Sequence, residues 1–250
     1  MSEQQSIAVI GGTGLYQLDG LEEVERLNLT TRWGEPSSEI IITQKADQQI
    51  AFLARHGLEH NIPPHKVNYR ANLWALKECG VKKIIAVAAV GGITGDMSPE
   101  TLVVPEQIID YTYARKHSFF EDDLEQVTHI DFTEPYSAEI RKALIDSALG
   151  QFTDIRSGGV YAATQGPRLE TAAEIERLKR DGANMVGMTG MPEAALAREL
   201  GIEYACLGLV VNWAAGCAGT RKIDHAEMQH IVDKGMIKLK AVLLNSLSRL

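Results

Sequence analysis

The chain has 250 residues, 45% of them hydrophobic, which is enough for one large α/β domain with a sizeable core, and we take residues 1–250 as a single domain. Its 25 Lys and Arg against 33 Asp and Glu give a formal net charge of −8, so no overall basic field favours a nucleic-acid partner. No apolar run approaches the ~20 residues of a membrane helix and no basic charge opens the N-terminus, so we expect a cytoplasmic protein with no membrane partner.

Short β-branched runs predict strands in the first half of the chain, and most are too apolar to alternate, so they are expected to be buried on both faces. A helix follows the third run, because apolar residues recur at helical spacing before Gly80. In chain order, these elements are strands 7–10, 40–43 and 50–53, a helix over 68–79, and strands 84–90 and 102–104. The stretch of about 111–135 is irregular and mixes charge with aromatics, which is typical of a functional or interface loop.

The second half alternates strands with helices that end at glycines. A strand over 160–163 precedes a helix over 170–180, and a strand over 185–188 precedes a helix with Pro192 in its first turn. A strand over 204–211 leads to a last helix, which we expect to begin at Asp224 with Glu227 completing a capping box. The alternation predicts the α/β class, with a central, mostly parallel or mixed β-sheet flanked by helices on both faces.

Three segments carry groups suited to phosphate. The loop Gly11-Gly12-Thr13-Gly14 follows the first strand and allows backbone N–H groups to converge on an anion, although it matches neither the dinucleotide nor the Walker pattern. Arg55 and His56 offer further donors after another strand, and Thr189 lies just upstream of a helix. The structural alternatives are a tight turn, a surface arginine beside a core histidine, and a helix cap.

Three other segments suit a heterocycle. Residues 88–92 close the most hydrophobic strand with side chains small enough for a ligand to touch the backbone. Glu170 lies at or near a predicted helix start and can accept an N–H, while Asn212 ends a strand with an amide that both donates and accepts. Close packing, a first-turn carboxylate and a turn-forming asparagine are the structural alternatives.

A metal site is not indicated. His56, His60 and His65 are close in sequence, but Gly57 and the prolines at 63 and 64 break any continuous helix, and no acid stands at the HExxH spacing. The three cysteines, at positions 79, 206 and 217, form neither a CxxC pair nor an even disulfide set.

Together these segments resemble the purine nucleoside phosphorylase and methylthioadenosine phosphorylase family, and within it the bacterial branch that acts on S-methyl-5′-thioinosine. The likeness spans almost the whole chain, since GGTG, ARHG, HKVNYRANLWALK, AAVGG, GPRLET, GMTGMPEA and VVN occur in the order and at the spacing of the family. The resemblance implies the nucleoside phosphorylase fold, a homotrimer with sites at subunit interfaces, and phosphorolysis of a purine nucleoside with phosphate as co-substrate and no cofactor or metal.

The resemblance also assigns roles by position. Residues matching the phosphate cradle are Thr13, Arg55, His56, Ala89 and Thr189. Met188 matches a residue against the ribose, and the base pocket is matched by Leu169, Glu170, Asn212 and Ala214. His60, His129 and Ile223 match positions around the 5′ end of the nucleoside, with His129 contributed by the neighbouring subunit. In this mechanism Asn212 binds N7 as charge builds on the leaving base, Glu170 holds the base, and phosphate attacks C1′.

Three base-pocket positions point to hypoxanthine. Asn212 and Glu170 match members that act on 6-oxopurines, and Ala214 replaces the second Asp of the adenine type. A carboxylate accepts from N1–H of hypoxanthine while the amide donates to O6 or N7, whereas adenine reverses the pattern at N1 and at its 6-amino group. Ile223 favours an apolar 5′ group, and hence methylthioinosine. The alternatives are a general inosine and guanosine phosphorylase, a methylthioadenosine phosphorylase, and a nucleoside- or phosphate-sensing protein without turnover; the orientation of Trp213 also bears on this choice.

Overall fold

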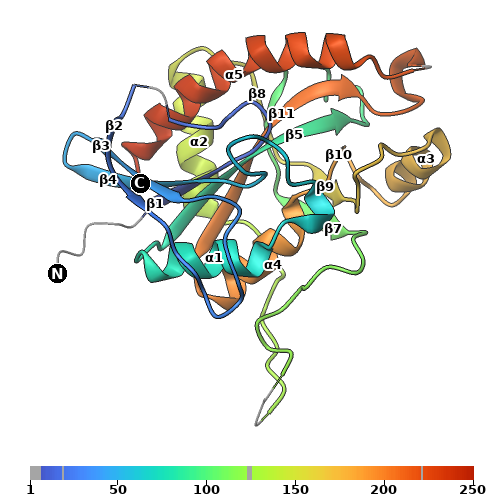
Figure 1. Ribbon diagram of the computed structural model, residues 1–250. Helices are drawn as coiled ribbons and strands as arrows, with labels where there is room; N and C mark the ends of the chain where they lie inside the picture. Colours follow the sequence, from blue (N-terminus) through green and yellow to red (C-terminus); the bar gives the residue numbers. More distant parts are fainter. Residues whose placement is uncertain (1–6, 19, 123–125, 221) are drawn as a thin grey trace.

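A mixed β-sheet forms the centre of the computed structural model, which describes residues 7–18, 20–122, 126–220 and 222–250 (Figure 1). Four neighbouring strands run parallel: β4 (Gln48–Ala54), β1 (Ile7–Gly11), β5 (Lys83–Gly92) and β11 (Glu203–Trp213). Their carboxyl ends therefore meet at one edge of the sheet, where α/β proteins bind ligands.

Shorter strands extend this parallel centre. On one side β3 (Ile40–Lys45) and β2 (Glu22–Leu27) add antiparallel pairs. On the other side β10 (Met185–Gly187) pairs antiparallel with the end of β5, followed by β9 (Val160–Ala163) and β7 (Gln107–Asp110). β11 also pairs antiparallel with β6 (Leu102–Val104), which pairs with β8 (Ile155–Ser157).

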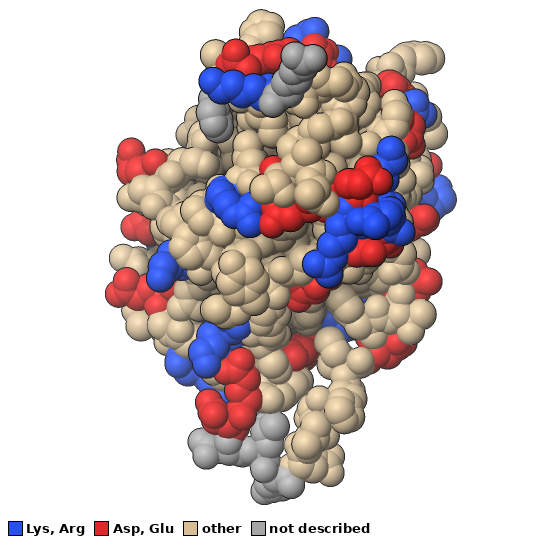
Figure 2. Space-filling view, turned by 90° about the vertical axis from the view of Figure 1, so that its right-hand side faces the viewer, with Lys and Arg blue, Asp and Glu red and all other residues tan. Residues whose placement is uncertain are grey.

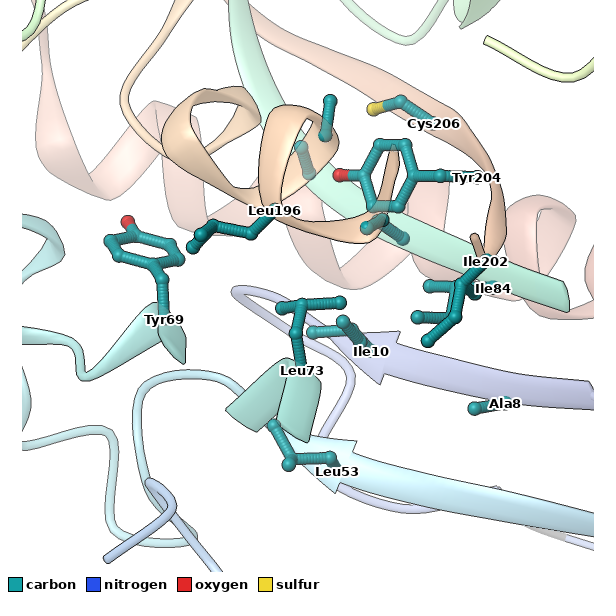
Figure 3. Close-up of a cluster of buried hydrophobic side chains, with 14 of the residues drawn as sticks. Ala8, Ile10, Leu53, Tyr69, Leu73, Ile84, Leu196, Ile202, Tyr204 and Cys206 are labelled. Carbon is teal, nitrogen blue, oxygen red and sulfur yellow. The ribbon is translucent and has the colours of Figure 1, made fainter. Parts of the chain in front are cut away.

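Helices cover both faces of the sheet (Figure 1). α1 (Tyr69–Glu78) and α4 (Gly190–Glu199) lie on one face, and α2 (Ala138–Gly150) and α5 (His225–Leu247) on the other, with α3 (Ala172–Arg180) at the side. Figure 3 shows the first face, where Leu73 of α1 and Leu196 of α4 lie near Ile10 and Ile84 of the sheet. Neighbouring strand residues such as Val9 and Ile85 are buried against the other face, so the central strands are buried on both sides as expected.

The predicted fold class is confirmed, and the predicted strands are all present with ends shifted by at most two residues. Gly80, Gly182 and Gly201 each follow a helix with positive φ, as their C-terminal role requires. Asp224 caps α5 through the N–H groups of Ala226 and Glu227, but no return bond from Glu227 completes the expected capping box in the described residues.

Three strands and one α-helix escaped prediction, namely β2, β7, β8 and α2. β2 reads EEVERL and is exposed at the sheet edge, so it lacks an apolar pattern, and β8 has only three residues. Between β7 and α2, the described residues 111–122 and 126–137 contain neither helix nor strand. Arg115, Phe119 and Tyr136 of this segment are buried against the body of the molecule, whereas part of the segment projects away from it, shown in green in Figure 1. We call the segment 111–135 the arm.

Charged side chains are mixed over the surface. On the face shown in Figure 2, Lys and Arg alternate with Asp and Glu and do not gather into one basic area. Among the helices of the described residues, none has both the length and the apolar character that a membrane crossing requires.

Candidate active site

A cavity of about 710 Å³ lies where the parallel strands end. Its walls come from the segments after β1, β4, β9 and β10, from the ends of β5 and β11, and from the start of α5. It brings together all of the site residues predicted from the sequence except His129, namely Thr13, Arg55, His56, His60, Ala89, Leu169, Glu170, Met188, Thr189, Asn212, Ala214 and Ile223.

The loop after β1 approaches the sheet so closely that only glycine fits at position 12. A Cβ on Gly12 would lie 2.4 Å from the carbonyl oxygen of Val87 and 3.2 Å from Nη1 of Arg55. The turn is closed by the N–H of Leu15, which donates to the Gly12 carbonyl at 3.0 Å. Gly12 therefore allows the backbone beside Thr13 to lie directly against the Arg55 guanidinium.

Arg55 is fully buried and paired with a carboxylate that sequence reasoning missed. Its Nε and Nη2 each donate to Glu193 at 2.6 Å, and Nη1 donates to the Val87 carbonyl at 2.9 Å. Tyr204 donates its hydroxyl to the same carboxylate at 2.8 Å. Burial opposes the charge on Arg55, but the Glu193 carboxylate outweighs burial, so the pKa of Arg55 is raised above its ordinary value. Three of its five N–H groups are used within the protein, and the side chain borders the cavity.

His56 has a fixed tautomer. Its Nδ1 lies 2.8 Å from the Ile62 carbonyl, which can only accept, so Nδ1 carries the proton. Burial, and then the nearby charge of Arg55, lower the pKa of His56 to about 4, so the ring is neutral near pH 7. In this state Nε2 can accept from a protonated phosphate oxygen or a sugar hydroxyl, and the contact of His56 with phosphate stays a prediction.

This pKa makes folding stability depend on pH. The unfolded chain takes up a proton at His56 near pH 6.5, whereas the folded chain does not until about pH 4. The contribution of His56 to the free energy of unfolding is therefore complete above pH 6.5 and is lost as the pH falls toward 4. The loss from this one group is about 3 kcal/mol. His56→Asn keeps a donor for Ile62 but cannot titrate, so its free energy of unfolding is expected to fall less over this range. Urea unfolding at pH 7, 5.5 and 4.5 measures this, with exposed His230→Asn as control; equal losses in wild type and His56→Asn would contradict the assignment.

Thr189 follows β10 and does not cap the helix after it. Its side chain makes no capping hydrogen bond, and Met191, with φ −121° and ψ 141°, interrupts the helical backbone before Pro192. The Thr189 N–H donates to the Tyr161 hydroxyl at 3.3 Å, which holds the segment against β9. The helix-cap alternative is therefore wrong, and Thr189 lines the cavity beside Met188.

Glu170 lies in the loop before α3 and not in its first turn. α3 begins at Ala172 and is capped by Thr171 and Glu174, and Arg168 binds Glu174 at 2.7 and 2.8 Å. Glu170 instead accepts from the Thr164 hydroxyl at 2.6 Å and lines the cavity. The carboxylate is thus held by a neutral hydroxyl and remains able to accept from a ligand.

Asn212 lies opposite Gly91 at the end of the β5–β11 pair, after a register shift between Val210 and Asn212. Its Nδ2 donates to the Trp213 carbonyl at 2.7 Å, and because that carbonyl only accepts, this contact fixes which end of the amide carries nitrogen. One N–H and the Oδ1 remain for a ligand. A Cβ on Gly91 would lie 3.5 Å from this Nδ2 and 3.6 Å from the Ala214 Cβ, so Gly91 leaves room beside the amide.

Trp213 does not narrow this cavity. It lines a separate pocket with Ile93, Ala172 and Cys217, and it is absent from the residues around the main cavity. The cavity wall instead includes Met228, Gln229 and Val232 of α5, which sequence reasoning treated only as parts of a helix. Met228 and Val232 belong to the apolar pattern of this helix, but only the packing of α5 beside the Thr13 loop gives the three residues a place at the site.

His129 lies outside the cavity of its own chain, exposed on the arm. His60 lines the cavity and its ring lies 4.9 Å from that of His56, with Tyr16 edge-on at 5.6 Å. Within the described part of the chain, no three His, Cys, Asp or Glu side chains come together as a metal site.

Comparisons with known proteins agree with this geometry. The model of the phosphorylase superfamily matches residues 6–248. A probable S-methyl-5′-thioinosine phosphorylase of Pseudomonas syringae pv. tomato is 55% identical over 241 residues, which cover 96% of this chain and 98% of the relative. A 6-oxopurine nucleoside phosphorylase of Pyrococcus furiosus is 45% identical over 233 residues, covering 91% of this chain and 86% of the relative.

A solved structure extends the comparison to the fold. Methylthioadenosine phosphorylase from Schistosoma mansoni, in complex with adenine, matches with a TM-score of 0.93 at 29% identity, covering 98% of this chain and 91% of the other. The family resemblance of the motifs is confirmed over nearly the whole length. The chain belongs to the phosphorylase superfamily.

Proposed function

We propose that the protein cleaves S-methyl-5′-thioinosine with phosphate, giving hypoxanthine and S-methyl-5-thio-α-D-ribose 1-phosphate. The observation that carries this proposal is the grouping of Glu170, Asn212 and Ala214 in one cavity with Arg55 and Thr189. A 6-oxopurine matches the acceptor of Glu170 and the remaining N–H of Asn212 at once. The relative from Pseudomonas syringae, at 55% identity, supports the same substrate.

The geometry suggests how the reaction proceeds. Phosphate would bind between the Thr13 loop, Arg55 and Thr189, while the base lies between Glu170 and Asn212. As the glycosidic bond breaks, Asn212 would stabilise the charge that builds on the purine, and the phosphate anion would stabilise the ribosyl cation and attack C1′. Inorganic phosphate is then the co-substrate, and the protein's part is to orient and stabilise both partners.

The more specific part of the proposal is that the nucleoside carries a methylthio group at its 5′ end. Ile223, Met228 and Val232 give the α5 side of the cavity an apolar wall, which suits a thioether better than a hydroxyl. The alternative is a general inosine and guanosine phosphorylase, which the 45% identical 6-oxopurine enzyme supports. A methylthioadenosine phosphorylase is disfavoured, because Glu170 would face an acceptor nitrogen of adenine.

Release of free base tests these alternatives together. Inosine, guanosine, S-methyl-5′-thioinosine and methylthioadenosine are incubated with the protein, with and without phosphate, and the bases are separated by chromatography. We expect hypoxanthine from methylthioinosine at the highest kcat/KM and only with phosphate. Binding without base release would indicate a nucleoside-sensing protein, and a preference for inosine and guanosine would indicate the general enzyme.

We further propose that the protein acts as a homotrimer in which the arm carries His129 to the site of a neighbouring subunit. His129→Ala is expected to lower kcat/KM, and mixing this variant with Glu170→Gln chains is expected to restore activity, since about a quarter of the shared sites regain both residues. Light scattering should give three times the 27.4 kDa of one chain. A fully active monomer, or no recovery on mixing, would contradict the proposal.

A further inference from the structure

Arg115 lies at the base of the arm, 9% exposed, and its guanidinium joins two segments that are far apart in sequence. Nη2 donates to the carbonyls of Thr164 at 3.1 Å and Gln165 at 2.7 Å, and Nε donates to the Gln165 side chain at 3.1 Å. Nη1 donates to the carbonyls of Met188 at 2.8 Å and Met191 at 2.6 Å. One side chain therefore links the segment after β9 to the segment after β10.

A third segment is attached through Tyr69. Nη1 of Arg115 lies 3.2 Å from the Tyr69 hydroxyl, which donates to the Pro64 carbonyl at 3.0 Å, and the guanidinium lies 5.4 Å from the Tyr69 ring centroid. Pro64 is part of the cavity wall. Arg115 itself does not line the cavity, but it is bonded, directly or through Tyr69, to three of the segments that do.

These contacts end at groups that face the cavity. Thr164, whose carbonyl Arg115 holds, donates its hydroxyl to Glu170 at 2.6 Å. Met188 lines the cavity itself, and Thr189 lies between the two carbonyls that Nη1 binds. The Glu170 carboxylate is thus linked to the guanidinium through Thr164, and Thr189 belongs to the segment whose carbonyls at 188 and 191 the guanidinium binds.

The charge of Arg115 is balanced by carbonyl dipoles instead of an acid. No carboxylate of the described residues lies within 4.0 Å of its guanidinium nitrogens, whereas buried arginines are usually paired with one. A planar guanidinium can bind several carbonyls in fixed directions, which an ammonium cannot.

We propose that Arg115 is a positioning residue that sets the separation between the purine-binding segment at Glu170 and the ribose- and phosphate-binding segment at Met188 and Thr189. This inference rests on the proposed function, because it concerns the same site. A reaction between two bound partners depends on their relative placement, and a misplacement of about 1 Å can lower the rate about 100-fold.

The deciding variant is Arg115→Lys, which keeps the charge but cannot span the same carbonyls. We expect it to fold, to lower kcat/KM for methylthioinosine about 100-fold, and to raise the KM of both nucleoside and phosphate. Arg115→Met removes charge and bridge together and should be at least as impaired. The matched control is Arg141→Lys, because Arg141 also donates to a backbone carbonyl, that of Pro105 at 2.9 Å, but lies away from the cavity.

Steady-state kinetics and thermal melts are measured on the same variants, so that a purely structural role of Arg115 can be distinguished from a positioning role. If Arg115→Lys is folded at the assay temperature with kcat and both KM values unchanged, or is unfolded there, Arg115 belongs to the fold and the proposal is overturned. Wild-type activity reports on the proposed function, whereas the ratio of variant to wild type reports on Arg115. Phosphate raises the melting temperature of any folded protein that binds it. A smaller rise for Arg115→Lys than for Arg141→Lys therefore supports the proposal even if the natural substrate is a nucleoside other than methylthioinosine.

Discussion

Arg55→Ala is expected to lower the free energy of unfolding by about 3–5 kcal/mol, because it leaves the fully buried Glu193 carboxylate without its cation. Tyr204 would remain as a donor to this carboxylate, but a neutral hydroxyl does not compensate a buried charge. The same substitution removes the guanidinium that borders the proposed phosphate site. A charge-assisted contact contributes about 1.5–3 kcal/mol, so the phosphate KM is expected to rise about 10- to 100-fold.

A second variant separates these two effects. In Arg55→Met with Glu193→Gln, the buried charge pair is replaced by neutral side chains of similar size, and the Gln oxygen still accepts from Tyr204. Such replacements are often neutral for stability. We therefore expect urea unfolding to return close to the wild-type value while the phosphate KM stays high. If the double variant restores the phosphate KM together with stability, Arg55 supports the fold and does not bind phosphate.

Asn212→Asp is expected to lower kcat/KM for methylthioinosine about 10- to 100-fold, since it replaces by an acceptor the N–H that faces O6 or N7 in the proposed binding mode. The variant also places a carboxylate oxygen beside the Trp213 carbonyl, where the amide now donates at 2.7 Å, so the side chain must turn away. In the proposed binding mode Glu170 would still face N1 of adenine in this variant. We therefore expect little gain on methylthioadenosine.

Changing all three base-side positions should move the preference toward adenine. Glu170→Ser and Ala214→Asp, added to Asn212→Asp, are expected to shift the ratio of the two kcat/KM values by more than the single changes sum to, because the three groups contact one ring. The measurement is kcat/KM for methylthioinosine and methylthioadenosine across the set, with melts to confirm folding. If the ratio of the two kcat/KM values in Asn212→Asp equals that of the wild type, Asn212 does not distinguish the groups at position 6 of the purine.

The sequence was informative where the pattern is local. Apolar runs located the central strands, and glycines with positive φ located the ends of α1, α3 and α4. Several motifs, among them those with Thr13, Arg55 and Asn212, follow or end a strand of the central sheet, and such positions meet at one edge, so these residues line the cavity as expected. The exposed, charged strand β2 shows the limit, since its pairing with β3 comes from the sheet and not from its own sequence.

Side-chain partners could not be predicted in the same way. The Glu193 carboxylate reaches Arg55 across 138 positions of chain, and the carbonyls that bind Arg115 lie 49 to 76 positions away. The tautomer of His56 depends on the Ile62 carbonyl, which is a backbone group and leaves no trace in residue identity. These contacts exist only once the loops are folded against one another.

The packing of α5 against the loop after β1 also joins two segments that are far apart in sequence. A Cβ at Gly14 would lie 2.7 Å from Val232 and 2.9 Å from Met236, so this loop and this helix are in direct contact. Both also line the cavity, through Gly12 and Thr13 from the loop and through Met228 and Val232 from the helix. A molecule that binds in the cavity is therefore expected to stabilise the loop and the helix together.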